Sequence, residues 1–178
     1  MHPNELLSEI PGLRRYARAL TGDAWAADDL VQDTLERACT KHRLWREGTD
    51  LRAWLFTLMH NLYMNQLQRV RRQNAAGREV DVDDSEAELI APALPTDTAL
   101  DLQRCLLLLP EEQREVLLLV TLEDLSYKTV ARITGVPEGT VMSRLSRARH
   151  RLQALMDGAP TAAGLPRAAE PVPLRRLK

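Results

Sequence analysis

Apolar residues recur along the chain with the period of an α-helix from its first turns onward. In the first segment they stand at steps of three and four, at Leu6, Leu7, Ile10, Leu13, Tyr16, Ala17 and Leu20. This spacing predicts an amphipathic helix, which Pro11 and Gly12 should interrupt or delay. A second helix is expected after Thr21-Gly22-Asp23, with inward positions at Ala27, Leu30, Val31, Thr34, Leu35 and Ala38. Strand-type alternation does not occur in the sequence.

A long third helix is predicted from about Leu51 to Arg72, a stretch without proline or glycine. At about 100° per residue, the two sides of this helix differ in chemistry. The apolar side carries Leu55, Leu58, Met59, Leu62 and Val70. The polar side carries Asn61, Asn65, Gln68 and Arg72. The first is expected to pack in a core and the second to face outward.

Helical periodicity stops after residue 72 and resumes near Asp97. Leucines at 100, 102, 106, 107 and 109 predict a fourth helix, and Pro110 is well placed to start a fifth that runs through Val116 to Val120. Ser126 offers an N-cap for a short helix over 127–134. Gly135 ends this helix, and Pro137 starts another that continues to about Met156.

The sequence therefore predicts an all-α protein of two small helical domains. Residues 1–76 form the first domain, 77–96 a flexible acidic linker, 97–156 the second domain, and 157–178 a disordered tail with prolines at 160, 166, 171 and 173. Prolines 92 and 95, Gly77 and clustered acids give the linker too little apolar surface to offset chain entropy.

The net charge of −1 conceals a segregation of charge along the chain. Residues 66–78 contain four arginines and no acid, whereas residues 79–101 contain eight acids and no lysine or arginine. A nucleic-acid partner usually requires a basic excess, and here that excess is local.

Several classes of protein are disfavoured by composition. Cys39 and Cys105 lie far apart within apolar patterns and are expected to be buried thiols, and the four histidines form no ligand cluster, so neither metal nor cofactor is expected. A signal peptide and an apolar run of about 18 residues are both lacking, which predicts a cytoplasmic protein without membrane insertion. A phosphate loop and a nucleophile elbow are also lacking, so the chain is not expected to be an enzyme.

A helix-turn-helix is predicted over 125–151, with the turn at Thr134-Gly135-Val136-Pro137. Its shared core should comprise Leu125, Val130, Ala131, Ile133, Val136, Val141, Leu145 and Leu152. The second helix carries donors suited to phosphates and base edges at Ser143, Arg144, Ser146, Arg147, Arg149 and Arg151. A solvated basic face is the alternative, and the glycine turn favours DNA binding.

Two polar faces in the first domain admit two interpretations each. The amides at 61, 65 and 68 run into Arg69, Arg71 and Arg72, which fits either nucleic-acid contact or a simple helix-dipole interaction. The second helix points Asp28, Asp29, Gln32, Asp33 and Glu36 outward. This face is either merely solvated or a site of protein contact.

Four motifs in this order resemble bacterial sigma factors of the extracytoplasmic-function (ECF) group, group 4 of the sigma-70 family. They are Ala27-Asp28-Asp29-Leu30-Val31-Gln32-Asp33-Thr34, Leu51-Arg52-Ala53-Trp54-Leu55 followed by Asn61, Leu109-Pro110-Glu111-Glu112-Gln113-Arg114, and the segment from Leu125-Ser126-Tyr127 through Val136-Pro137-Glu138-Gly139-Thr140-Val141 to Ser143-Arg144-Leu145. The resemblance extends from about Leu6 to Leu155.

The resemblance implies regions two and four of a sigma factor, and it assigns partners to the polar faces. Core RNA polymerase would be bound at its beta-prime clamp helices by Asp29, Gln32, Asp33 and Glu36, and also at its beta flap. The third helix would open the minus-ten element, and Asn61, Asn65 and the Trp45–Asp50 loop would surround a flipped base. Trp54 would lie in the core. The upstream duplex would be contacted by Gln68, Arg69, Arg71 and Arg72. Ser143, Arg144, Ser146, Arg147 and Arg149 would read the minus-35 element.

The resemblance also implies control by an anti-sigma factor, in the manner of a stress-response regulator. Met142 and Ser146 depart from residues frequent in the family, so the base preference does not carry over. Two other functions remain open from the sequence. One is a sigma-mimic decoy that sequesters an anti-sigma factor, although no receiver domain accompanies the motifs. The other is a conventional helix-turn-helix regulator, for which the sequence offers no coiled-coil dimer seam.

Overall fold

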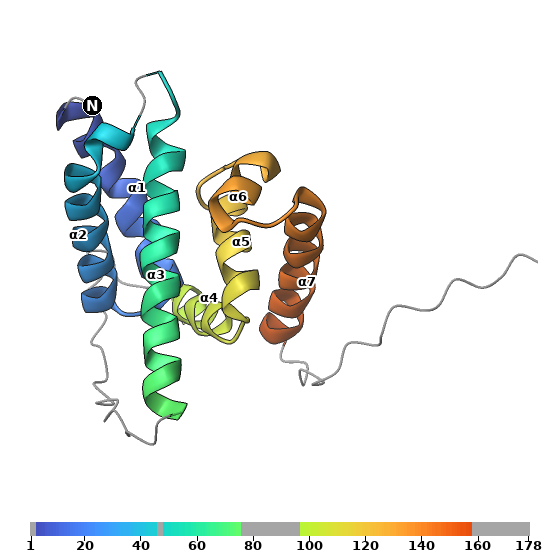
Figure 1. Cartoon of the computed structure of the whole chain (residues 1–178). Coiled ribbons are helices and arrows are strands. Elements are labelled where there is room, and N and C mark those ends of the chain that lie inside the picture. The colour runs from blue at the N-terminus through green and yellow to red at the C-terminus, as the bar shows by residue number, and fades with distance from the viewer. Residues whose placement is uncertain (1–2, 46–47, 76–96, 158–178) are drawn as a thin grey trace, which may run out of the picture.

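The computed structural model describes residues 3–45, 48–75 and 97–157. These residues form α1 (Pro3–Thr21), α2 (Ala24–Thr40), a short 3₁₀ turn (His42–Leu44), α3 (Leu51–Ala75), α4 (Asp97–Leu107), α5 (Glu111–Thr121), α6 (Tyr127–Thr134) and α7 (Glu138–Met156) (Figure 1). The predicted all-α class is confirmed. The predicted linker and, apart from Asp157, the predicted tail lie outside the described residues.

The first three helices form an N-terminal bundle (α1–α3), and its first turn between helices is set by local chemistry. The Asp23 carboxylate caps α2 by accepting a hydrogen bond from the Ala26 amide at 2.7 Å. Gly22 adopts a left-handed φ of 75°, and a Cβ at this position would lie 2.5 Å from Cδ1 of Leu107 in α4. A glycine is therefore needed both for the turn and for the approach of α4.

The expected interruption of the first helix at Pro11 is wrong, because α1 runs unbroken from residue 3 to residue 21 with Pro11 inside it. An interior proline costs a helix about 3 kcal/mol. The turns beyond it bury Leu13, Tyr16, Ala17 and Leu20 almost completely. Their burial, at roughly 1.5–3 kcal/mol for each large apolar side chain, exceeds that cost.

The predicted apolar side of α3 is confirmed except at its end. Leu55 and Met59 are fully buried, whereas Val70 is 49% exposed. The last turns of α3 extend past α1 and α2, so a residue there has no core to enter (Figure 1). Trp54 packs against the core as predicted. Phe56 is also buried, with its ring meeting that of Tyr16 edge to face at a centroid distance of 5.1 Å.

The remaining helices form a C-terminal bundle (α4–α7) around α5, in which Val116 and Leu119 are fully buried. The predicted helix-turn-helix core is confirmed. Val130, Ile133, Val141 and Leu145 are buried, and Leu125, Ala131, Val136 and Leu152 pack against them. Both α4 and α5 contact α7, which holds the second helix of the motif on the outside of the bundle.

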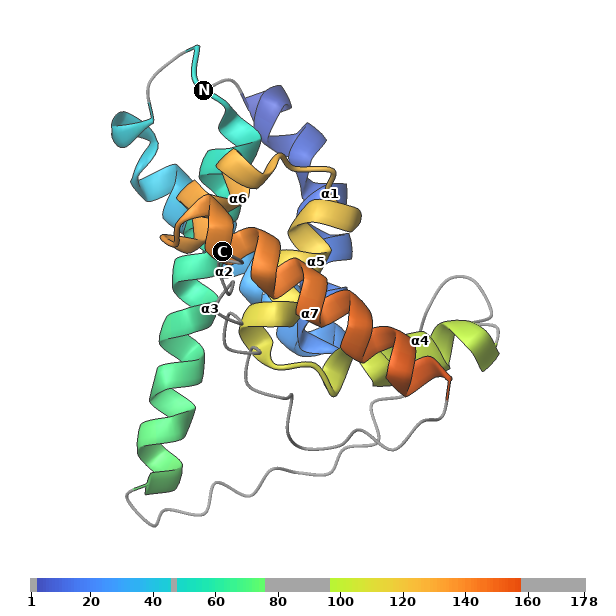
Figure 2. The same cartoon turned by 90° about the vertical axis from the view of Figure 1, so that its right-hand side faces the viewer.

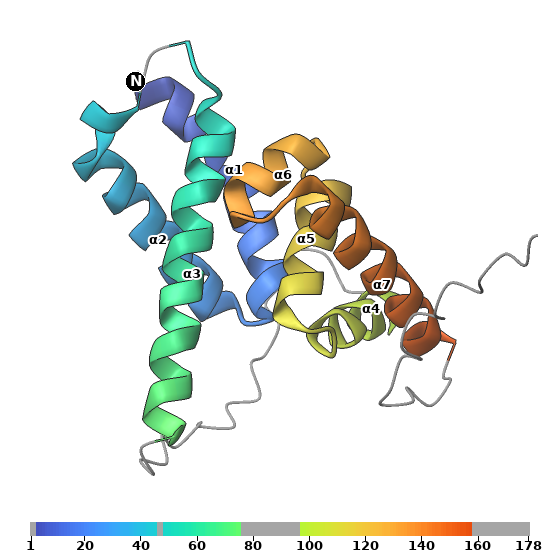
Figure 3. The same ribbon diagram turned by 45° about the vertical axis from the view of Figure 1, so that its right-hand side comes forward.

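The two bundles pack against one another. α6 lies against α3, and α4 and α5 lie against α1 (Figures 2 and 3). The apolar cores of the two bundles join in one cluster across this contact. Polar pairs also cross it: Arg15 of α1 and Arg52 of α3 both bind Glu123, and Arg114 of α5 donates to the Tyr63 hydroxyl at 3.1 Å. We call this contact surface the interbundle seam.

The expectation of buried thiols is wrong, because Cys39 is exposed and Cys105 is half-buried. Cys39 lies one position from the buried Ala38, on the edge of α2 that faces outward. Among the described residues, no three His, Cys, Asp or Glu side chains are grouped to hold a metal ion. No described helix is long and apolar enough to cross a membrane.

Replacing Phe56 by Ala should lower the free energy of unfolding by about 3–5 kcal/mol, because a fully buried aromatic ring leaves a cavity. Chemical denaturation followed by circular dichroism measures this change. Val70→Ala is the matched control, since its side chain is half exposed and no more than about 0.5 kcal/mol is expected. Equal losses for the two variants would contradict the assignment of the core face.

Candidate nucleic-acid interface

The turn of the helix-turn-helix is built by two local devices. The Ser126 hydroxyl accepts a hydrogen bond from the Thr129 amide at 3.2 Å and so caps the start of α6. Gly135 ends α6 with φ 69° and ψ 23°, a left-handed conformation that disfavours residues with a Cβ. Pro137 then precedes α7. The sequence from 126 to 137 thus sets the angle between α6 and α7.

The exposed face of α7 contains most of the predicted minus-35 residues. Ser146, Arg147 and Arg149 are exposed, whereas Val141, Leu145 and Ala148 are buried. Ser143 is half-buried, and its hydroxyl donates to the Thr140 carbonyl at 3.0 Å. Met142 and His150 share the exposed face and line a hollow of about 340 Å³ beside Ser146 and Arg149. Sequence reasoning did not assign His150 to this face.

Arg144 lies apart from the other predicted readers on α7. It points toward α5, where its Nη2 lies 2.5 Å from a carboxylate oxygen of Glu112, and its side chain is only 21% exposed. On α7, Ser146 therefore lies between Arg147 and Arg149, which are about 160° apart on the two flanks of the exposed face, and Arg144 lies at the border with α5.

The polar stripe of α3 is exposed along its length. Asn61, Asn65, Gln68, Arg69 and Arg72 are all exposed. Arg71 differs, because its Nη2 binds the Glu111 carboxylate of α5 at 3.1 Å. Four of the residues thus share the stripe, Arg69 lies on its flank, and Arg71 faces the C-terminal bundle.

A cavity of about 260 Å³ lies beside the amides of α3. It is lined by Arg37 and Lys41 from the end of α2 and by Leu58, Asn61, Leu62 and Asn65 from α3. Sequence reasoning missed the two cations, although their spacing of four residues places them on one side of a helix. The cavity combines amides for a base edge, apolar side chains for a base face and cations for a phosphate.

The loop expected at this pocket does not line the cavity in the part of the chain that the structure describes. Trp45 is half-buried, and residues 48–50 are exposed. Arg46 and Glu47 lie outside the described residues.

The outer face of α2 is acidic, as predicted. Asp29, Gln32 and Glu36 are exposed, and the Gln32 amide donates to the Glu36 carboxylate at 3.2 Å. Partial burial, followed by repulsion from Asp29 and Glu36, raises the pKa of Asp33 above its ordinary value. Asp28 differs from this group, because it forms an ion pair with Arg14 of α1 at 3.0 Å.

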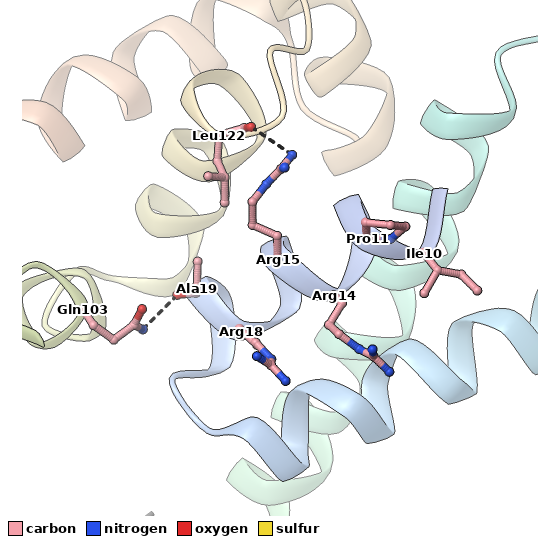
Figure 4. Close-up of a pocket in the computed structure, with 8 residues that line it drawn as sticks. All are labelled: Ile10, Pro11, Arg14, Arg15, Arg18, Ala19, Gln103 and Leu122. Carbon is pink, nitrogen blue, oxygen red and sulfur yellow. Dashed lines mark hydrogen bonds between the residues drawn. The ribbon is translucent and has the colours of Figure 1, made fainter. Parts of the chain in front are cut away.

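A groove of about 540 Å³ runs along the interbundle seam (Figure 4). α1 contributes Ile10, Pro11, Arg14, Arg15, Arg18 and Ala19, and the C-terminal bundle contributes Gln103 and Leu122. The Gln103 amide donates to the Ala19 carbonyl at 3.4 Å, and Arg15 donates to the Leu122 carbonyl at 3.5 Å. The groove is thus mainly apolar and edged by arginines, and it exists only where the two bundles meet.

An exposed polar helix in one bundle and a helix-turn-helix in the other fit the two-region sigma-factor class, and family models match both halves of the chain. The model described as "Sigma2 domain of PhyR" matches residues 6–60, and "Sigma-70, region 4" matches residues 99–152.

Whole-chain relatives give the family. The chain is 39% identical over 162 residues to the ECF RNA polymerase sigma factor EcfG of Rhodopseudomonas palustris, covering 88% of this chain and 86% of the relative. It is 34% identical to the ECF sigma factor SigM of Mycobacterium tuberculosis, covering 81% and 71% of the two chains. The protein belongs to the ECF RNA polymerase sigma factors, which are not enzymes.

Solved structures share the fold. The sigma factor RpoE of Bartonella quintana, solved in complex with the anti-sigma factor NepR, matches with a TM-score of 0.76 and 37% identity over 86% of this chain and 95% of that chain. The anti-anti-sigma factor PhyR matches with a TM-score of 0.53 and 18% identity, and the chain covers 48% of it, so that likeness concerns the fold alone.

Proposed function

We propose that this sigma factor brings core RNA polymerase to promoters by reading the minus-35 element with α7 and opening the minus-ten element at α3. The observation that carries the proposal is the cavity where Asn61 and Asn65 lie beside Arg37 and Lys41. In this assignment residues 1–76 form the region 2 domain and 97–156 the region 4 domain, joined by 77–96.

The cavity has the chemistry of a nucleotide site. Asparagine amides can donate to and accept from the edge of an unpaired base, and Leu58 and Leu62 offer an apolar surface to its ring. Arg37 and Lys41 would neutralise an adjacent phosphate. Removing a base from the stack costs a few kcal/mol, which these contacts would offset. Gln68, Arg69 and Arg72 continue toward the duplex, with Arg71 joining them once it leaves Glu111.

The exposed face of α7 supplies the second DNA contact. Ser143, Ser146 and Arg149 would face the major groove of the minus-35 element, with Arg144 and Arg147 beside them contacting phosphates. Arginine can bind guanine or phosphate through two donors, while serine accepts several bases. The position of α7 on the outer side of its bundle, away from α1–α3, supports this role (Figure 3).

The acidic face of α2 is proposed to dock on the beta-prime clamp helices of core polymerase, while the C-terminal bundle contacts the beta flap. These residues, Asp29, Gln32, Asp33 and Glu36, lie on α2, which packs mainly on α1 and α3 within its own bundle. The three acids among them repel DNA, so a protein partner fits this face better. The protein would act in the cytoplasm, together with polymerase and chromosomal DNA.

An anti-sigma factor is the proposed regulator. The similar RpoE of Bartonella quintana is described in complex with NepR, and CnrH with the cytosolic domain of CnrY. In this chain the arginine-edged groove at the seam supports a partner that touches both bundles.

Transcription by purified core polymerase tests the function directly. With this protein added, a sheared genomic library should yield discrete start sites that share two upstream elements. Asn65→Ala should reduce these transcripts at least about tenfold, because the loss of a contact that contributes about 1.4 kcal/mol changes an equilibrium tenfold. Binding of duplex DNA by α7 should persist. Binding of core polymerase without any start site would favour the sigma-mimic decoy, and binding of duplex DNA alone would favour a conventional regulator.

Replacing Arg147 by Ala should weaken binding to all promoter sequences by a similar factor. It should also reduce the slope of log K against log salt concentration by about 0.9, because one phosphate contact fewer releases fewer counterions. Fluorescence anisotropy of the holoenzyme on labelled minus-35 duplex at several salt concentrations measures both effects. Arg104→Ala removes the same charge from the exposed side of α4 and should leave the slope unchanged. An unaltered slope in the Arg147 variant would exclude a phosphate contact there.

Reversing Asp33 to Arg should weaken binding to core polymerase at least tenfold, as expected when one charged docking contact becomes repulsive. A raised folded-state pKa means that ionised Asp33 destabilises the fold, and stability is regained as pH falls through that pKa. Asp33→Asn should therefore not lower the melting temperature at neutral pH, which makes it the control for folding. Titration of labelled protein with core polymerase gives the affinities, and a normal affinity for the Arg variant would place docking elsewhere.

A further inference from the structure

The hollow on the exposed face of α7 combines apolar and polar side chains. Its volume is about 340 Å³, and its lining consists of the largely apolar Tyr127, Met142 and Leu145 and the polar Ser146, Arg149 and His150. Leu145 is buried, whereas Met142 is 54% exposed. The free chain therefore presents an apolar side chain to solvent in the middle of a polar surface.

The position of Met142 distinguishes it from an ordinary exposed apolar residue. Single apolar side chains are common on protein surfaces and need no partner. At about 100° per residue, however, Met142, Ser146 and Arg149 lie within about 60° of one another on α7. The helix begins at Glu138, so Met142 belongs to its second turn. The N-terminal turns of a recognition helix are the part that contacts base edges, and Met142 thus lies within the proposed reading surface.

The chemistry of Met142 restricts what it can recognise. Its thioether donates no hydrogen bond and accepts only weakly. Base pairs present donors and acceptors in the major groove, and the 5-methyl group of thymine is the apolar feature among them. Against the edge of guanine or cytosine, Met142 would leave polar atoms without hydrogen bonds, which is unfavourable. Against thymine, its flexible side chain can pack on the methyl group.

We propose that Met142 selects a thymine in the minus-35 element by packing against the 5-methyl group of that base at the hollow. The inference rests on the proposed role of α7 in binding this element. Arg149 lies seven residues beyond Met142, or about 10 Å along the helix, so it contacts a different base pair. Met142 therefore sets the base preference at one position, while Ser146 and Arg149 form hydrogen bonds at others.

A duplex that lacks single methyl groups tests this assignment. Core polymerase carrying the protein is mixed with DNA duplexes whose upstream region is randomised, and sequencing of the retained duplexes gives the preferred minus-35 element. Each thymine of that element, on either strand, is then replaced by deoxyuridine, which pairs identically but has no 5-methyl group. Fluorescence anisotropy gives the Kd for each duplex. At one thymine, loss of the methyl group should raise the Kd about fourfold, as expected for one buried methyl group.

Variants of Met142 show whether this residue makes the contact. Met142→Ala should raise the Kd for the thymine duplex several-fold and bind the thymine and uracil duplexes equally, because the methyl group has no side chain to pack on. Met142→Leu keeps an apolar side chain and should retain a difference between the duplexes. Neither variant should change the slope of log K against log salt concentration, since an uncharged side chain displaces no counterions.

Met156→Ala is the matched control. Met156 is 50% exposed and is the last residue of α7. It lies about 20 Å along the helix axis from Met142. Met156→Ala should therefore bind every duplex as the unaltered protein does.

The inference is overturned if no deoxyuridine changes the Kd, or if the preferred minus-35 element contains no thymine on either strand. It is also overturned if Met142→Ala shows the same uracil effect as the unaltered protein. These results leave the proposed function intact when Arg147→Ala still reduces the salt slope. If no holoenzyme forms, or if it retains no preferred sequence, the proposed function fails and the inference fails with it.

Discussion

The arrangement of the two bundles depends on satisfying buried carboxylates of the C-terminal bundle. Glu115 is buried and binds His60 of α3. The side chain of Glu123 has no exposure, so it must be paired, and the two guanidinium groups that reach it come from different helices. This requirement fixes the end of α5 against α1 and α3 together. It also explains the glycine at position 12, since a Cβ there would lie 3.3 Å from the carboxylate. Charge pairing of this kind specifies geometry more than it adds stability.

The inward faces of the helices and their outward faces serve separate purposes. Leu30, Leu55 and Val141 are fully buried and hold α2, α3 and α7 in place. The opposite faces are thereby free to differ in charge: acidic on α2, amide and basic on α3, basic on α7. Because a helix presents each face in a fixed direction, three surfaces for three kinds of contact can be carried on two small bundles.

Local chemistry made the helices predictable from sequence, whereas contacts between distant residues did not. Ser126 and Gly135 mark the ends of α6 through capping and a left-handed φ, signals that need no tertiary knowledge. Most of the polar stripe on α3 followed from periodicity alone. By contrast, Val70 and Cys39 were expected inside because periodicity shows which side is apolar but not where the neighbouring helix ends. From the sequence, Glu123 cannot be distinguished from a solvated surface charge, because the arginines that pair with it lie in the other bundle.

Consecutive acids at the start of α5 link the two candidate DNA surfaces. Glu111 binds Arg71 at the end of α3, and Glu112 binds Arg144 of α7. Acids are favoured at this position by the positive end of the helix dipole, so their presence has a purely structural cause. In the proposed function they would have a second effect, because each holds one arginine that could otherwise contact a phosphate. Exposed ion pairs are worth only about 0–1 kcal/mol. A phosphate backbone, which also releases counterions on binding, can therefore displace both carboxylates. In the proposed function, the same arginines would be held in place by the fold before promoter binding and transferred to DNA during it.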